Sequence, residues 1–170
     1  MRSKKALPEL PSTRICGGCT ACCKTHAVVE LKKEPFTWCK HCIIGEGCSI
    51  YAKRPTDCKE YRCFWLENAQ YLGEQYLTEN DRPDRLKVVL DHHRIPFGGG
   101  RAVSMVIFRE VEEGAMEQPR IKEIKAKLAS RGFSVTVDVL FQKEPQIYFA
   151  DFCILSPSER MFLVRQLPSI

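Results

Sequence analysis

Nine cysteines between positions 16 and 63 are the densest group of potential ligands in this chain of 170 residues. They are Cys16, Cys19, Cys22, Cys23, Cys39, Cys42, Cys48, Cys58 and Cys63. Cysteine thiolates bind zinc and hold iron–sulfur clusters. Because thiols stay reduced inside cells, this density favours metal binding over a disulfide framework. The tenth cysteine, Cys153, lies in an apolar stretch and is expected to be a buried core residue.

The spacing of these cysteines contains two C-x2-C knuckles. The first, CGGC at 16–19, has two glycines that permit the tight turn needed for both thiolates to reach one ion. The second, CKHC at 39–42, could complete a zinc-ribbon-like site with the first. Adjacent side chains point apart in most backbones, so Cys22 and Cys23 are expected to serve different ions or to bridge two. The sequence therefore predicts two or more metal ions.

Two kinds of metal centre agree with this pattern. Zinc is the first choice, because structural four-cysteine sites built from knuckles are common. Iron is the alternative, since C-x2-C-x2-C followed by a remote cysteine also typifies 4Fe–4S proteins, although the final cysteine–proline pair of ferredoxins is missing. His41 lies inside the second knuckle and is expected to stay outside the coordination shell, because cysteines already outnumber the ligand positions.

The cysteine pattern also resembles a known family. It consists of C-x2-C-x2-C-C at 16–23, a cysteine at 42 and CSIY-x2-RP-x2-C at 48–58. This combination is similar to the YkgJ-like cysteine-cluster proteins, which are described as zinc- or iron-chelating. The resemblance covers roughly residues 14–66 and implies metal binding by these cysteines, with the metal left open.

The chain is expected to fold in two parts. The first part is a cysteine-cluster metal-binding module at 14–78. Its residues 14–66 are rich in cysteine and poor in aliphatic periodicity, so they would need metal to fold. A helix interrupted at Gly73 is predicted over 64–77. The segment ENDRPD at 79–84 carries turn and helix-breaking residues and marks the predicted boundary.

Residues 85–167 are expected to form a small α+β domain. Strands are predicted at 86–90, 103–108, 133–141 and 147–152, and helices from Pro119 to a C-cap at Gly132 and over 156–167. The order β-β-α-β-β-α predicts a mostly antiparallel sheet with one or two helices. The expected fold class is therefore α+β, with a metal-stabilised cysteine module preceding the sheet.

Charge and hydropathy restrict the partners that we expect. The formal net charge is +5 with thiols counted as neutral, but metal-bound thiolates would offset most of it, so nucleic-acid binding is not expected. No stretch approaches the ~18 apolar residues of a membrane-spanning helix. The first residues lack the apolar core of a secretory signal, which predicts a cytoplasmic location.

The residues agree with functions from two classes. In the first, the cysteine cluster binds metal for a structural, storage or delivery role towards a partner protein. In the second, an iron–sulfur centre transfers electrons, as an accessory to an enzyme. The chain has no Ser/His/Asp set, P-loop or dinucleotide fingerprint, so no catalytic residue is assigned and an enzyme is the less favoured interpretation.

Overall fold

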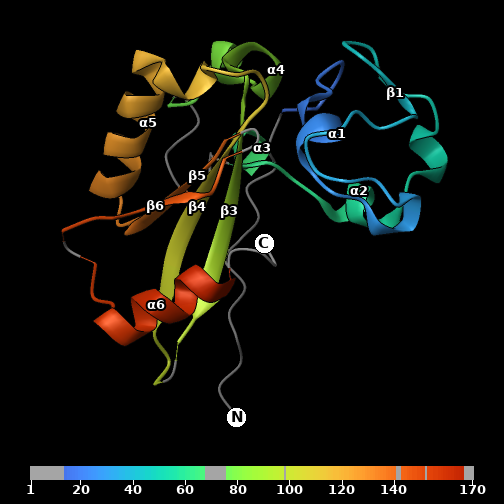
Figure 1. Ribbon diagram of the computed structural model, residues 1–170. Helices are drawn as coiled ribbons and strands as arrows, with labels where there is room; N and C mark the ends of the chain where they lie inside the picture. Colours follow the sequence, from blue (N-terminus) through green and yellow to red (C-terminus); the bar gives the residue numbers. More distant parts are fainter. Residues whose placement is uncertain (1–13, 68–75, 98, 141–142, 152, 167–170) are drawn as a thin grey trace.

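The computed structural model describes residues 14–67, 76–97, 99–140, 143–151 and 153–166. A cysteine-bearing part made of short elements lies beside a four-stranded sheet that carries helices (Figure 1). The predicted α+β class is confirmed. Helix α1 and helix α3 of the cysteine-bearing part both pack on strand β3, which is an edge strand of the sheet.

The cysteine-bearing part is built from elements of at most five residues. In chain order they are α1 (Ala21–Thr25), η1 (Val29–Leu31), β1 (Cys42–Ile43), β2 (Gly47–Cys48), η2 (Tyr51–Lys53), α2 (Thr56–Glu60) and α3 (Phe64–Glu67). Such short helices are marginal by themselves, so tertiary contacts must hold them. Of the helix predicted over 64–77, the structure describes α3, and the interruption at Gly73 lies outside the described residues.

A glycine lets the first knuckle approach the β1–β2 turn closely. A Cβ atom added at Gly18 would lie 2.4 Å from the carbonyl oxygen of Gly45, which is closer than real atoms pack. The two main chains therefore touch at this point. The knuckle itself is a tight turn, in which the Cys19 amide donates to the Cys16 carbonyl at 2.9 Å.

The main sheet has the strand order β3-β4-β5-β6. Its strands are β3 (Val88–Pro96), β4 (Ala102–Glu110), β5 (Val135–Val139) and β6 (Gln146–Phe149). The β3–β4 and β5–β6 pairs are antiparallel, and β4 and β5 run parallel because helix α5 connects them. The predicted order and the mostly antiparallel pairing are thus confirmed, with one parallel pair inside the sheet.

Helices cover both faces of this sheet. Helix α5 (Pro119–Ser130) buries Ile121, Ile124 and Leu128, the three residues that the sequence places on one face. It ends in a Schellman motif: Gly132 has a φ of 87°, and the Phe133 amide donates to the Leu128 carbonyl at 3.1 Å.

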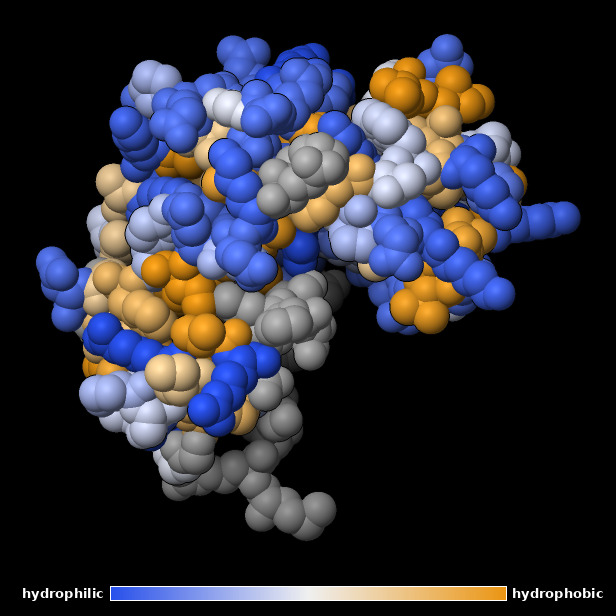
Figure 2. Space-filling model, in the orientation of Figure 1, coloured by the Kyte–Doolittle hydropathy of each residue, from blue (hydrophilic) through white to orange (hydrophobic). Residues whose placement is uncertain are grey.

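Helix α6 (Pro157–Gln166) covers the opposite face more sparingly. Its Leu163 is fully buried against apolar residues of β4 and β5. Met161, Phe162 and Val164 stay exposed, and apolar surface gathers over this helix in Figure 2. This face of the sheet therefore has a thinner cover than the face under α5.

The apolar core continues across the predicted boundary at 79–84. Ala21, Cys63 and Phe64 from the cysteine-bearing part belong to the same buried cluster as Leu90 and Phe108 of the sheet. The boundary segment itself forms η4 (Glu79–Asp81) and α4 (Pro83–Leu86). The division into two domains stays a prediction, but the described residues of both parts share one core.

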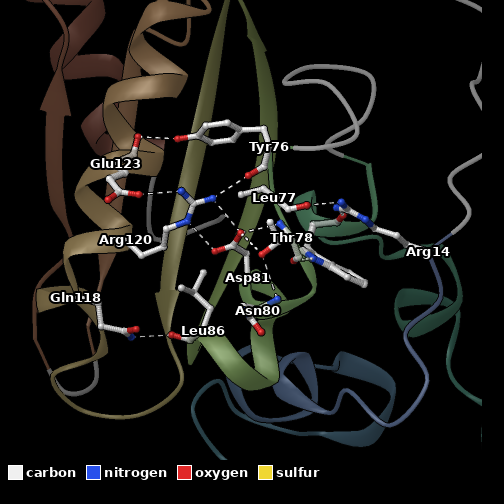
Figure 3. Close-up of polar contacts among 11 residues, drawn as sticks. Arg14, Tyr76, Leu77, Thr78, Asn80, Asp81, Leu86, Gln118, Arg120 and Glu123 are labelled. Atoms are coloured by element: carbon white, nitrogen blue, oxygen red, sulfur yellow. Dashed lines mark hydrogen bonds and ion pairs between the residues drawn. The ribbon is translucent and has the colours of Figure 1, made fainter.

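Arg120 binds the boundary segment to helix α5 (Figure 3). Its guanidinium donates to both carboxylate oxygens of Asp81, at 2.8 and 3.0 Å, and to the Tyr76 carbonyl at 2.8 Å. Asp81 is 4% exposed and also accepts from the Thr78 amide at 2.7 Å, which closes a capping box. Burial acts to raise the pKa of Asp81, but the hydrogen bonds from Arg120 and Thr78 leave it below its ordinary value.

Replacing Arg120 by alanine should destabilise the fold, because a buried carboxylate would lose its charged partner. We expect the free energy of unfolding at pH 7 to fall by about 2 kcal/mol, less than for a fully buried pair because the Arg120 side chain is 32% exposed. The Asp81 contribution is complete above its unfolded pKa, near ~3.9, and is lost as the pH falls through the lower folded pKa. Denaturation of Arg120→Ala at pH 7 and at acid pH should show the difference shrinking on acidification. The matched control is Arg131→Ala, at an exposed arginine, and an equal loss there would contradict this assignment.

Candidate metal centre

Seven of the nine candidate cysteines line one cavity of about 190 Å³. They are Cys16, Cys19, Cys22, Cys23, Cys39, Cys48 and Cys58. They come from the first knuckle, helix α1, the second knuckle, strand β2 and helix α2. All ten cysteines of the chain lie within the described residues, and all carry free thiols. Segments up to 42 residues apart in sequence thus bring reduced sulfur atoms to a shared space.

Cys23 is at the middle of the larger thiol group. Its thiol is hydrogen-bonded to those of Cys22 and Cys42, and its carbonyl accepts from the Cys39 amide at 3.0 Å. The hydrogen bond with Cys22 and then burial raise the pKa of Cys23 well above its ordinary value. Adjacent cysteines 22 and 23 therefore interact with each other, whereas the sequence led us to expect side chains that point apart.

Cys42 and Cys58 extend this group. Burial, followed by the neighbouring Cys23, raises the pKa of the Cys42 thiol to about 11. Burial also raises the pKa of Cys58, with further contributions from Cys23, Cys39 and Cys48. The group as a whole comprises Cys22, Cys23, Cys39, Cys42, Cys48 and Cys58. At neutral pH the raised pKa values keep the thiols of Cys23, Cys42 and Cys58 protonated.

The first knuckle lies near a different cysteine. Burial raises the pKa of Cys63 to about 12, and Cys16 and Cys19 contribute to the rise. Cys19 also hydrogen-bonds Asp84 of helix α4. The first knuckle thus lies near Cys63, and it also shares the cavity with Cys39 of the second knuckle, so the zinc-ribbon-like pairing stays a prediction.

The chain breaks its helical path between Cys58 and Cys63. Helix α2 ends at Glu60, and Tyr61 takes an extended conformation with φ −65° and ψ 130°. Cys63 then enters the apolar core with an exposed fraction of 8%. The two cysteines therefore belong to different thiol groups.

A buried lysine lies beside the larger thiol group. The Lys33 ammonium donates to the carbonyls of Lys24, His26 and Glu34, with distances of 3.2 Å to Lys24 and 3.0 Å to Glu34. Burial lowers the pKa of Lys33, and the neighbouring cysteines, Cys39 foremost, oppose this. Lys33 therefore holds a positive charge where ligand-bound thiolates would place negative charge. His41 also lines the cavity.

The donor set fits a metal centre in kind and number, but the thiols do not yet surround one point. Among the described residues, no group of three or more His, Cys, Asp or Glu side chains has the arrangement needed to hold a metal ion. Ion binding would therefore need thiol side chains to turn inwards and lose their protons.

A buried polar network, which the sequence did not reveal, adjoins the cavity. Asp91 in β3 is 4% exposed and accepts from Arg109 of β4 at 2.6 Å, from His26 at 3.0 Å and from the Tyr61 hydroxyl. Burial acts to raise the pKa of Asp91, but the hydrogen bond from His26 and the charges of His26 and Arg109 leave it well below its ordinary value. The one available signal was an aspartate in the otherwise apolar start of a strand, VVLD at 88–91.

Comparisons with known proteins add no relative. No family model, curated protein or solved structure matches this chain. The resemblance to the YkgJ-like proteins therefore stays an expectation from the cysteine spacing. No helix in the described ranges combines the length and the apolar character that crossing a membrane requires.

Burial predicts an order of thiol reactivity in metal-free protein. Cys16 is exposed, whereas Cys63 and Cys153 are each 8% exposed. Because thiolates are the reactive form and burial raises the pKa of Cys63 to about 12, iodoacetamide at pH 8 should modify Cys16 at least ~10-fold faster than Cys63. A time course of peptide mass spectrometry in the presence of a chelator measures these rates, with denatured protein as the control. Similar rates at the three positions in native protein would contradict the fold described here.

Proposed function

We propose that residues 16–63 bind metal ions through cysteine thiolates, and that the protein uses them in a structural, storage or delivery role towards a partner. The observation that carries this proposal is the cavity lined by seven free cysteines. Buried cysteines are common singly, but a core has no packing reason to collect seven thiols around open space. Free thiols also support a location in a reducing compartment such as the cytoplasm.

Zinc is the first choice of metal, and two or more ions per chain are proposed. The two thiol groups support this number, since Cys63 adjoins the first knuckle while Cys42 adjoins Cys23. A zinc ion needs four ligands at about 2.3 Å, which the larger group of six cysteines can supply. The resemblance to zinc- or iron-chelating proteins supports metal binding without choosing between the two metals.

Metal counting tests the proposal directly. Protein purified without oxygen should hold at least two metal ions per chain by elemental mass spectrometry. Cys23→Ser should lose at least one of them, because Cys23 contacts two other thiols. Cys153→Ser is the matched control and should keep the full content, because Cys153 lies in the apolar cluster under α6.

The nature of the ligands gives a second readout of the same samples. X-ray absorption should show sulfur neighbours near ~2.3 Å and little nitrogen. A nitrogen shell that disappears in His41→Ala would bring His41 into the coordination sphere. Wild-type protein that takes up less than one ion per chain at saturating zinc and at saturating iron would sink the proposal.

An iron–sulfur centre is the second candidate, and the size of the cavity favours it. About 190 Å³ lined by seven thiols is more space than one tetrahedral ion occupies. A polynuclear cluster would use that space and would explain adjacent, interacting thiols at 22 and 23. Such a centre would suit electron transfer to a partner enzyme.

The absorption spectrum of freshly purified anaerobic protein separates the two candidates. An iron–sulfur centre predicts brown protein with broad visible absorption, acid-labile sulfide and bleaching on reduction with dithionite. Zinc predicts colourless protein with no labile sulfide. Colourless, iron-free protein after expression with added iron and sulfide would rule out the second candidate.

A further inference from the structure

The carboxylate of Asp91 contacts the ends of helices α1 and α2, the two helices that carry cysteines of the larger thiol group. Asp91 lies in β3, and its two oxygens are divided between the segments. The Oδ2 atom lies 3.0 Å from His26 Nε2, and the Oδ1 atom accepts from the Tyr61 hydroxyl. His26 caps the end of helix α1, and Tyr61 follows directly after helix α2.

These two contact residues sit next to cysteines that line the cavity. Cys22 and Cys23 lie in α1, within one turn of His26, and the His26 amide donates to the Cys22 carbonyl at 3.2 Å. Cys58 lies in α2, one turn before Tyr61. The rings of His26 and Tyr61 touch, with centroids 4.4 Å apart, and both residues line the cavity themselves.

The sheet holds Asp91 firmly. Val89 of β3 pairs with Arg109 of β4, so Asp91 and Arg109 are diagonal neighbours on one face, where the guanidinium donates to Oδ2 at 2.6 Å. Arg109 is 8% exposed and Asp91 is 4% exposed, so the pair is shielded from water. Burying a carboxylate without hydrogen-bond partners costs free energy. This cost keeps Arg109, His26 and Tyr61 at hydrogen-bonding distance from Asp91 and therefore close to one another.

We propose that Asp91 is a positioning residue for the metal centre: it sets the spacing of α1 and α2 so that Cys22, Cys23 and Cys58 face one cavity. The sheet is then the scaffold that orders the ligands. This inference rests on the proposed function for its metal readout, and on the hydrogen bonds of Asp91 for its structural readout.

The test compares the same deletion at two buried carboxylates of the sheet. Asp91→Ala removes the contacts to His26 and Tyr61. Asp138→Ala is the matched control, because Asp138 in β5 is 6% exposed and its partners, Lys125 at 2.5 Å and Tyr148, do not line the cavity, whereas His26 and Tyr61 do. Asp91→Asn keeps the shape, since its oxygen can accept from His26 and Arg109 while its amide donates to the Tyr61 oxygen.

Cobalt(II) serves as the metal probe because thiolate-bound tetrahedral Co²⁺ absorbs visible light. We expect Asp91→Ala to bind Co²⁺ 10- to 100-fold more weakly than wild type with altered d–d bands, on the scale of lost outer-shell support in known metal sites. Asp91→Asn should recover most of this loss, and Asp138→Ala should stay within about threefold of wild type. Hydrogen exchange of metal-free protein gives the second readout: residues 21–26 and 56–61 should exchange faster together in Asp91→Ala and not in Asp138→Ala.

The outcomes separate this inference from the proposed function. If wild type binds no Co²⁺ but both segments still respond to Asp91→Ala, the metal proposal fails and the positioning role stands as a structural one. If Asp91→Ala keeps wild-type affinity and spectrum, or if Asp138→Ala loses as much, the positioning role is overturned. If Asp91→Ala does not fold, Tyr61→Phe decides, because it removes one hydroxyl only: a weakening of about 3- to 10-fold supports the role, and unchanged affinity overturns it.

Discussion

The carboxylate of Asp91 lies where water does not reach, and four parts of the chain meet at it. Strand β3 carries it, strand β4 supplies Arg109, and the cysteine-bearing part supplies His26 and Tyr61. Each partner offsets part of the free-energy cost of burying the charge. Loss of any one of them would leave the buried carboxylate partly unpaired and destabilise the fold. The position of the cysteine-bearing helices α1 and α2 on the sheet follows from this one site. Apolar contacts of Phe64, in helix α3, also hold the cysteine-bearing part on the sheet.

Protonated thiols explain how many cysteines can share an apolar cavity before any ion arrives. Thiolates packed together would repel one another, but burial and mutual hydrogen bonds favour the neutral form at Cys23, Cys42 and Cys58. Neutral thiols pack as small apolar groups. Lys33, held by three carbonyls, is already in place to balance charge that appears when protons leave.

Much of the sheet was predictable because its signals are local. The spacing of Ile121, Ile124 and Leu128 identified α5, and alternation identified β5, although the strand is shorter than predicted. The cysteine spacing identified the candidate ligands but not which of them lie together, since that depends on contacts between segments far apart in sequence. The Asp91 network depends on the β3–β4 register and on contacts across 65 residues of chain, as between His26 and Asp91. No sequence pattern within either segment predicts a contact between them.

The contact between Gly18 and Gly45 brings the first knuckle against the β1–β2 turn. It joins main chain to main chain, so the knuckle with Cys16 and Cys19 packs directly against the hairpin that carries Cys48. The φ angle of Gly18 is not in the left-handed region, so its backbone shape would suit any residue, and only lack of room excludes a side chain. Even one methyl group there would force the knuckle and the turn apart. A side chain at position 18 therefore cannot be accommodated by a rotamer change, because the atom that it would meet belongs to the peptide backbone of Gly45.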